Sequence, residues 1–144
     1  MDKTEQNILE WIDSVSTMRS ELGGLAICPF AKRAKYKIIE LSDEKINPDF
    51  STVEVIIYIL DSNYTFFEID KIAKKYNNEF PSLVFLPDSK DRYSHINNVQ
   101  TNNTKYNLML CQERSKLQVG RDKLSKTSYY TYWDEKYLKE ILEQ

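Results

Sequence analysis

The chain has 144 residues, of which 41% are hydrophobic and 29% are charged, and its formal net charge is -2. This size and composition predict one domain over residues 1–144, with a core that needs neither disulfides nor metal ions. The small negative charge disfavours a nucleic-acid partner, and no apolar run is long enough to cross a membrane. Two widely spaced cysteines and a polar, acidic start predict a cytoplasmic protein with reduced thiols.

A first helix is predicted over residues 4–22, because apolar residues recur there at spacings of three and four. The apolar stripe consists of Ile8, Ile12, Val15, Met18 and Leu22. Gly23 and Gly24 follow it and favour a sharp turn, since glycine accepts the left-handed conformation of a helix end.

The stretch from Leu25 to Arg33 combines a thiol, a proline and several cations. Pro29 suits the first position of a helical turn whose N-cap is Cys28. The open N–H groups of such a turn, together with Lys32 and Arg33, favour a thiolate. Two interpretations stay open: Cys28 is a small buried core residue, or it is a nucleophile or an anion-binding corner.

A second basic segment spans residues 114–126, far from the first along the chain. If the fold brings the two segments together, a small anionic ligand is expected to bind between them. The expected ligand-binding residues are Cys28, Pro29, Phe30, Lys32, Arg33, Arg114 and Arg121. The alternative is that both segments are solvated faces.

Two strands are predicted over residues 36–41 and 53–60, where β-branched and aromatic residues dominate. The connection between them is polar and contains Asn47-Pro48-Asp49, which is typical of a turn. We therefore expect an antiparallel hairpin.

A second helix is predicted to start at Thr65, because Thr65 and Glu68 form a capping box, and to end before Pro81. Strands over 82–86 and 105–112 follow, and Cys111 in the last strand is expected to be a core thiol. Residues 87–104 are interpreted as a long polar loop. Its single histidine, His95, is either a metal ligand with Asp88 and Asp91 or a solvated residue.

A final helix is predicted near the C-terminus, where Thr131 and Asp134 form a capping pair. Its core stripe would consist of Trp133, Tyr137, Leu138, Ile141 and Leu142. Packing explains most of these aromatic residues, and stacking on nucleic-acid bases is the alternative.

The order helix, strand, strand, helix, strand, strand, helix predicts an α+β fold with helices packed on a four-stranded antiparallel sheet. This order equals that of a ferredoxin-like sandwich whose first strand has moved to the end of the chain.

Two resemblances bear on the Cys28 stretch. Trp11, Leu25-x-Ile27-Cys28-Pro29-Phe30-Ala31-Lys32, Thr101-Asn102-Asn103 and Glu113-Arg114 resemble a family of bacterial proteins with a Cys-Pro-Phe-Ala signature, domain of unknown function 1415. That family implies no activity. Cys28-Pro29-Phe30-Ala31 is also similar to the active-site motif of omega-class glutathione transferases, and Phe80-Pro81 is similar to their cis-proline segment. The second resemblance implies a thioredoxin-like fold as the alternative, with redox or transfer chemistry at Cys28.

Three glycines are too few for a dinucleotide fingerprint or a phosphate-binding loop, so no cofactor is expected. We predict a module that binds a small anion or a partner. Two alternatives are a thiol-dependent enzyme or redox protein with Cys28 as its catalytic residue, and a homo-oligomer built through the C-terminal aromatic segment. The sequence alone does not decide whether the protein is an enzyme.

Overall fold

The computed structural model describes residues 2–16, 18, 34–41, 45–92, 95–96, 99–127, 129–133 and 138–139. The chain divides into two compact units. The sheet unit consists of residues 34–93 and 102–117, and the terminal unit consists of residues 1–33, 94–101 and 118–144. The single domain over 1–144 stays a prediction.

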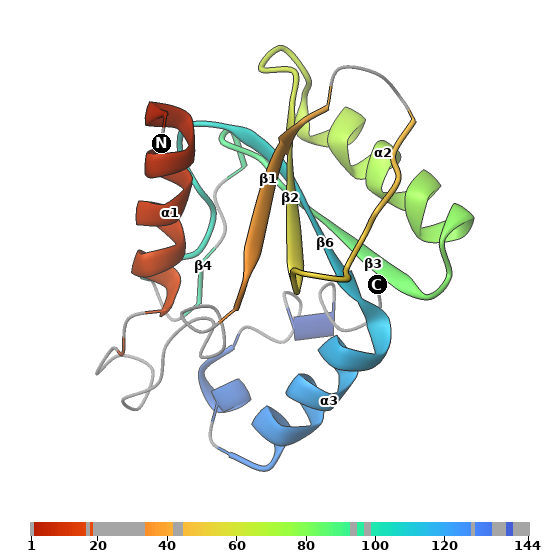
Figure 1. Cartoon of the computed structure of the whole chain (residues 1–144). Helices are drawn as coiled ribbons and strands as arrows, with labels where there is room; N and C mark the ends of the chain where they lie inside the picture. The colour runs from red at the N-terminus through yellow and green to blue at the C-terminus, as the bar shows by residue number, and fades with distance from the viewer. Residues whose placement is uncertain are drawn as a thin grey trace. The chain divides into compact units, whose positions relative to one another are not determined.

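Four strands form the sheet of the sheet unit: β1 (Tyr36–Glu40), β2 (Val55–Leu60), β3 (Leu83–Asp88) and β6 (Asn107–Glu113). They lie in the order β1-β2-β6-β3 (Figure 1). β6 runs antiparallel to both of its neighbours, whereas β1 runs parallel to β2. The α+β class and the four-stranded sheet are confirmed, but the sheet is mixed and not antiparallel.

The strand order is that of the permuted ferredoxin-like arrangement, and the direction of β1 is where the prediction was wrong. The connection from β1 to β2 is not a hairpin turn, because the two strands pair parallel and β2 therefore starts at the same end of the sheet as β1. A crossover needs about a dozen residues, which this connection supplies. Ile46, Phe50 and Val53 explain its path, because they pack against the core.

The core of the sheet unit lies between one face of the sheet and helix α2 (Phe66–Glu79). β2 and β3 run in the same direction with β6 between them, so β2, α2 and β3 form a split βαβ unit. The buried residues of this cluster are Ile56, Tyr58, Leu60, Ile69, Ala73, Tyr76, Leu83, Phe85, Met109 and Cys111.

Helix α2 begins with the capping box that the sequence predicts. The Glu68 backbone N–H donates to Thr65 Oγ1 at 3.3 Å, and the Thr65 N–H donates to Glu68 Oε1 at 3.0 Å. Both donors would otherwise be unsatisfied at the helix start. At the other end the Phe80 N–H donates to the carbonyl of Tyr76.

The outer edge of β3 is closed by a side chain of α2. Asn77 accepts a hydrogen bond from the Phe85 N–H at Oδ1 (2.7 Å) and donates from Nδ2 to the Phe85 carbonyl (3.1 Å). The amide therefore pairs with Phe85 as a neighbouring strand would. Pro87 further along this edge has no N–H to offer.

Replacing Asn77 by alanine is expected to lower the free energy of unfolding by about 1 to 3 kcal/mol, because both polar groups of Phe85 lose their partner. Urea denaturation of the variant beside Asn78→Ala measures the effect. Asn78 is exposed on the same helix. Equal losses in both variants would contradict a specific role for the Asn77 amide.

The terminal unit contains α1 (Lys3–Ser16), on which Ile8, Ile12 and Val15 are buried. This is the predicted stripe; residues 17 and 19–22 of the predicted helix lie outside the described residues. Trp11 donates from its indole N–H to the carbonyl of Thr101 at 3.1 Å. The described residues contain no helix of the length and apolarity needed to cross a bilayer.

The expected 87–104 loop and the expected start of the final helix differ from the structure, whereas residues 138 and 139 are helical. β4 (His95–Ile96) and β5 (Val99–Gln100) pair antiparallel inside the supposed loop. Tyr129–Tyr132 is a 3-10 helix, so Thr131 lies within it and does not cap a helix start. Trp133 is partly buried against the rings of Tyr129 and Tyr130. Three predicted core residues of the final helix lie outside the described residues, namely Tyr137, Ile141 and Leu142.

Candidate functional site

Most of the residues predicted to bind a ligand lie outside the described part of the chain. These are Cys28, Pro29, Phe30, Lys32 and Arg33. The anion site and the catalytic thiol therefore stay predictions. Only Arg114 and Arg121 of the predicted set can be placed.

Arg114 stands at the start of α3 (Arg114–Ser125), directly after β6. Its Nε donates to the carbonyl of Pro81 at 3.0 Å, and a terminal nitrogen donates to the carbonyl of Leu83 at 3.1 Å. Its backbone N–H donates to the carbonyl of Ser82. Arg114 thus fastens the turn between α2 and β3. Arg121 lies on the part of α3 that belongs to the terminal unit and is partly buried.

Cys111 is a free thiol in the middle of β6, with no exposed surface. Burial raises its pKa to about 12, because the low-dielectric surroundings disfavour the thiolate. The prediction of a core thiol is confirmed, and Cys111 is no candidate nucleophile.

In a Cys28→Ser variant, which leaves Cys111 as the only thiol, iodoacetamide is expected to react at least ~100-fold more slowly with native than with urea-unfolded protein. Mass spectrometry of timed samples measures the two rates. Comparable rates would contradict the burial of Cys111.

The described residues contain a buried polar cluster at one end of the sheet unit. We use the name polar cluster for Asp88, Ser89, Asn102, Asn103 and Asn107. Four of these residues are 1% to 6% exposed, and Asp88 keeps partial solvent access. Polar groups are buried at such density only where they find hydrogen-bond partners.

Asp88 is the acceptor at the centre of the cluster. Its Oδ1 receives hydrogen bonds from the Asn103 backbone N–H at 2.9 Å and from Asn103 Nδ2 at 2.7 Å. No donor within the described residues reaches Oδ2. One oxygen of the carboxyl group is therefore held by two donors, while the other is without a partner in the described chain.

Asn103 links Asp88 to the turn before β6 by hydrogen bonds. Its Oδ1 accepts the N–H groups of Lys105 at 3.0 Å and Tyr106 at 2.7 Å. Asn102 joins the segment before β6 to the segment after β3, because its Nδ2 donates to the carbonyl of Ser89 at 3.2 Å. The two strand ends, after β3 and before β6, are thus joined at more than one point.

Asn107 anchors the cluster to the loop between β2 and α2. Its Nδ2 donates to the carbonyls of Asp61 at 3.0 Å and Tyr64 at 2.9 Å. Its Oδ1 accepts from the Ser89 hydroxyl at 3.4 Å. The cluster consequently connects the ends of β2, β3 and β6.

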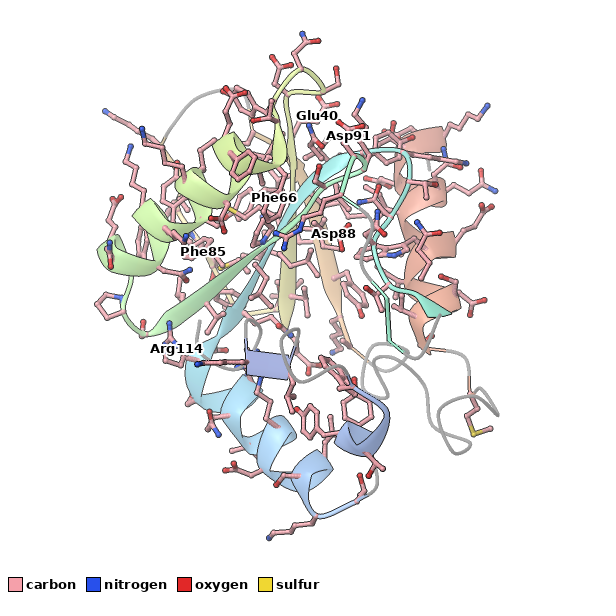
Figure 2. The ribbon with its side chains drawn as sticks, turned by 180° about the vertical axis from the view of Figure 1, so that it is seen from behind. Glu40, Phe66, Phe85, Asp88, Asp91 and Arg114 are labelled. Carbon is pink, nitrogen blue, oxygen red and sulfur yellow. The ribbon has the colours of Figure 1, made fainter. Side chains whose placement is uncertain are left out.

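The directions of the strands bring acidic residues to this end of the sheet. β1, β2 and β3 all run the same way, so their carboxyl ends share one edge. Glu40 ends β1, Asp61 follows β2, and Asp88 and Asp91 lie at and after the end of β3. Figure 2 shows Glu40 and Asp91 toward one end of the sheet and Arg114 toward the other, with Asp88 between them.

The structure adds no support for a metal site at these acids. Among the described residues, no group of three or more His, Cys, Asp or Glu side chains is arranged to hold a metal ion. His95 lies on β4, and its side chain is outside the described residues, so the metal hypothesis that joined it to Asp88 and Asp91 stays a prediction.

Burial raises the pKa of Asp88 to about 7, and the two Asn103 hydrogen bonds oppose that rise. Near neutral pH the carboxyl group therefore exists in both protonation states. It can accept a hydrogen bond or carry a negative charge toward a cation at its unpartnered oxygen. A carboxyl group whose pKa is shifted to near neutral pH is typical of binding and catalytic sites.

Sequence reasoning placed Asp88, Asn102 and Asn103 in a polar loop, with Asp88 as a possible metal ligand beside His95 and with Asn102 and Asn103 in the resemblance to the Cys-Pro-Phe-Ala family. It did not assign a role to Ser89 or Asn107, and it did not expect a buried cluster. The useful signal was the position of the polar residues: Asn107 opens an apolar strand, and Asp88 directly follows one. Polar residues at those positions are expected at the edge of a sheet, where strand ends meet.

No family model matches the chain, and no curated protein or solved structure matches it. The resemblance to the Cys-Pro-Phe-Ala family and the resemblance to omega-class glutathione transferases, with its thioredoxin-like fold, stay predictions.

Proposed function

We propose that this protein is a binding module for a small organic cation, held by Asp88 at the carboxyl edge of the sheet. The observation that carries the proposal is the Asp88 carboxyl group, with Asn103 bound to one oxygen and nothing in the described chain bound to the other. A ligand with positively charged N–H groups would supply the missing donor and the missing charge.

The energetics favour a cation at this position. Burial disfavours the charged form of Asp88, so the carboxylate stays poorly compensated until an opposite charge arrives. A charge-assisted hydrogen bond between an ammonium or guanidinium group and a carboxylate is roughly twice as strong as a neutral one. The ligand would lower the pKa of Asp88 and bind as the carboxylate.

The choice of residue also supports a binding role. An asparagine at position 88 would offer Asn103 the same acceptor oxygen without the cost of burying an ionisable group. A residue that lowers stability where a neutral one would fit is typical of functional sites.

Titration of the ¹⁵N-labelled protein with methylguanidinium at pH 7.5 tests the proposal. We expect saturable shifts of the Asn103 backbone and side-chain amide signals in the wild type and in Asp91→Asn. In Asp88→Asn we expect no saturable shift. Unshifted Asn103 signals in the wild type, or equal shifts in the Asp88→Asn variant, would exclude Asp88 as the binding group.

The same experiment with sulfate addresses the anion site predicted from the sequence. Binding at the Cys28 turn would shift the amide signals of residues 29–31 before any others. Shifts confined to Asn103 with the cation, and to residues 29–31 with the anion, would separate the two sites.

A further inference from the structure

The polar cluster lies where the chain leaves the sheet unit and returns to it. Residues up to 93 belong to the sheet unit, residues 94–101 belong to the terminal unit, and Asn102 re-enters the sheet unit. Asp88 and Ser89 lie in the chain before residues 94–101, and Asn102 and Asn103 lie directly after them. The hydrogen bonds of the cluster therefore join the two ends of the excursion formed by residues 94–101.

Two contacts make this junction. Asn103 donates twice to Asp88 Oδ1, and Asn102 donates to the carbonyl of Ser89. Only the first contact involves a group that can change its charge. Asn103 in turn accepts the N–H groups of Lys105 and Tyr106. A change in the protonation of Asp88 is therefore expected to affect the turn before β6 through Asn103.

We propose that the contact between Asp88 and Asn103 is a pH-sensitive clasp, which holds the two ends of the 94–101 excursion together in acid and loosens them at neutral pH. The clasp needs no ligand. It shares the buried Asp88 carboxyl group with the proposed cation site, but it can fail while cation binding holds, because its test is made without a ligand. Opening it would expose the Asp88 carboxyl group to water and release the turn at residues 103–106.

The direction follows from the two states of the carboxyl group. In the closed clasp, Asp88 keeps its proton up to a pH of about 7, because burial raises its pKa. In an open, hydrated clasp the pKa returns toward about 4. Between these values the closed form binds more protons, so each rise of one pH unit favours opening by at most about tenfold.

The other charged residues at this edge of the sheet are not among the causes of the raised pKa of Asp88. The charged residues at the ends of the neighbouring elements are Glu40, Asp61, Glu68, Lys90, Asp91, Arg92 and Lys105. The pKa of Asp88 is raised by burial and lowered by Asn103, with no contribution from these charges. Arg92 instead lies over the ring of Phe66, 4.0 Å from its centroid.

Native-state hydrogen exchange at pH 5 and pH 8, corrected for the intrinsic exchange rate at each pH, tests the clasp. The reporting amides are Asn103, Lys105 and Tyr106, whose N–H groups end on Asp88 or Asn103. Their opening constants are expected to be at least ~10-fold larger at pH 8. The Arg114 amide, which donates to Ser82 at the other end of the sheet, is the internal control for global unfolding, and its opening constant should be smaller than those of the reporting amides at both pH values.

Two variants test whether the pH dependence of the opening constants comes from Asp88. Asp88→Asn should show the same opening constants at both pH values, whereas His95→Gln should keep the pH dependence of the wild type. His95 is the matched control because an ordinary histidine also titrates between pH 5 and 8. A pH dependence that survives in Asp88→Asn or disappears in His95→Gln would overturn the proposal, and so would opening constants of the reporting amides that equal that of Arg114 at both pH values.

Discussion

Replacing Phe85 by alanine is expected to lower the free energy of unfolding by about 3 to 5 kcal/mol, the largest effect of any substitution considered for this chain. Phe85 has no exposed surface and lies at the centre of the core cluster. Its ring centroid is 5.4 Å from that of Tyr76 and 6.0 Å from that of Phe80. Truncation removes this packing and leaves a cavity that α2 and β3 cannot fill.

Phe67→Ala is the matched control for this experiment. Phe67 is 83% exposed on the same helix that covers Phe85. Its loss should change the free energy of unfolding by no more than about 0.5 kcal/mol. Guanidinium denaturation of the three proteins measures both values, and similar losses in the two variants would contradict a core centred on Phe85.

Replacing Asp88 by asparagine is expected to make the protein more stable above pH 7 and to leave its stability unchanged below pH 4. The sign follows from proton binding. As the pH rises from about 4 to 7, the unfolded chain has lost the proton of Asp88 while the folded chain keeps it, so the wild type loses stability. The variant has no such proton and does not share the loss.

A pKa rise from 3.8 to about 7 corresponds to at most roughly 4 kcal/mol above pH 7. Asp88 keeps partial solvent access, which reduces the expected gain of the variant to about 1 to 3 kcal/mol. Urea denaturation of both proteins at intervals from pH 4 to 8 gives the difference. Asp91→Asn, at an exposed acid three residues away, should follow the wild type throughout.

A destabilising effect of Asp88→Asn that is the same at every pH would carry a different meaning. It would indicate that the carboxylate strengthens the Asn103 contacts more than burial weakens it. Asp88 would then be a structural residue of the turn before β6, and the argument for a ligand at its second oxygen would fail.

Local signals in the sequence were sufficient for the elements of the sheet unit. The Thr65 and Glu68 pair marks the start of α2 because its two hydrogen bonds depend only on residues three apart. The apolar runs of β2 and β6 mark buried strands for the same local reason. Such patterns need no knowledge of the rest of the fold.

The direction of β1 depended on contacts that are distant in sequence. Asn47 and Pro48 are typical of a turn, but Ile46 and Phe50 beside them pack on the core. Burial of these apolar side chains stabilises a crossover more than a polar turn could stabilise a hairpin. The apolar residues within this largely polar connection, Ile46, Phe50 and Val53, were the available sign of that path.

The candidate site was hidden for a related reason. Pro87-Asp88 is typical of a turn, and a turn aspartate is usually solvated. Asp88 is instead the last residue of β3, and Asn103 reaches it from fifteen residues further along the chain. The desolvation of Asp88 depends on that pairing across the end of the sheet, which no local pattern encodes.

The titration of the Asp88 side chain tests the account most directly. Carbon-13 NMR of the carboxyl carbon, assigned by comparison with the Asp88→Asn variant, follows this single group from pH 3 to 9. We predict a midpoint near pH 7, with the amide signals of Asn103 and Tyr106 moving over the same range. A midpoint near the ordinary value of 3.8 would contradict the buried carboxyl group, the cation site and the clasp together.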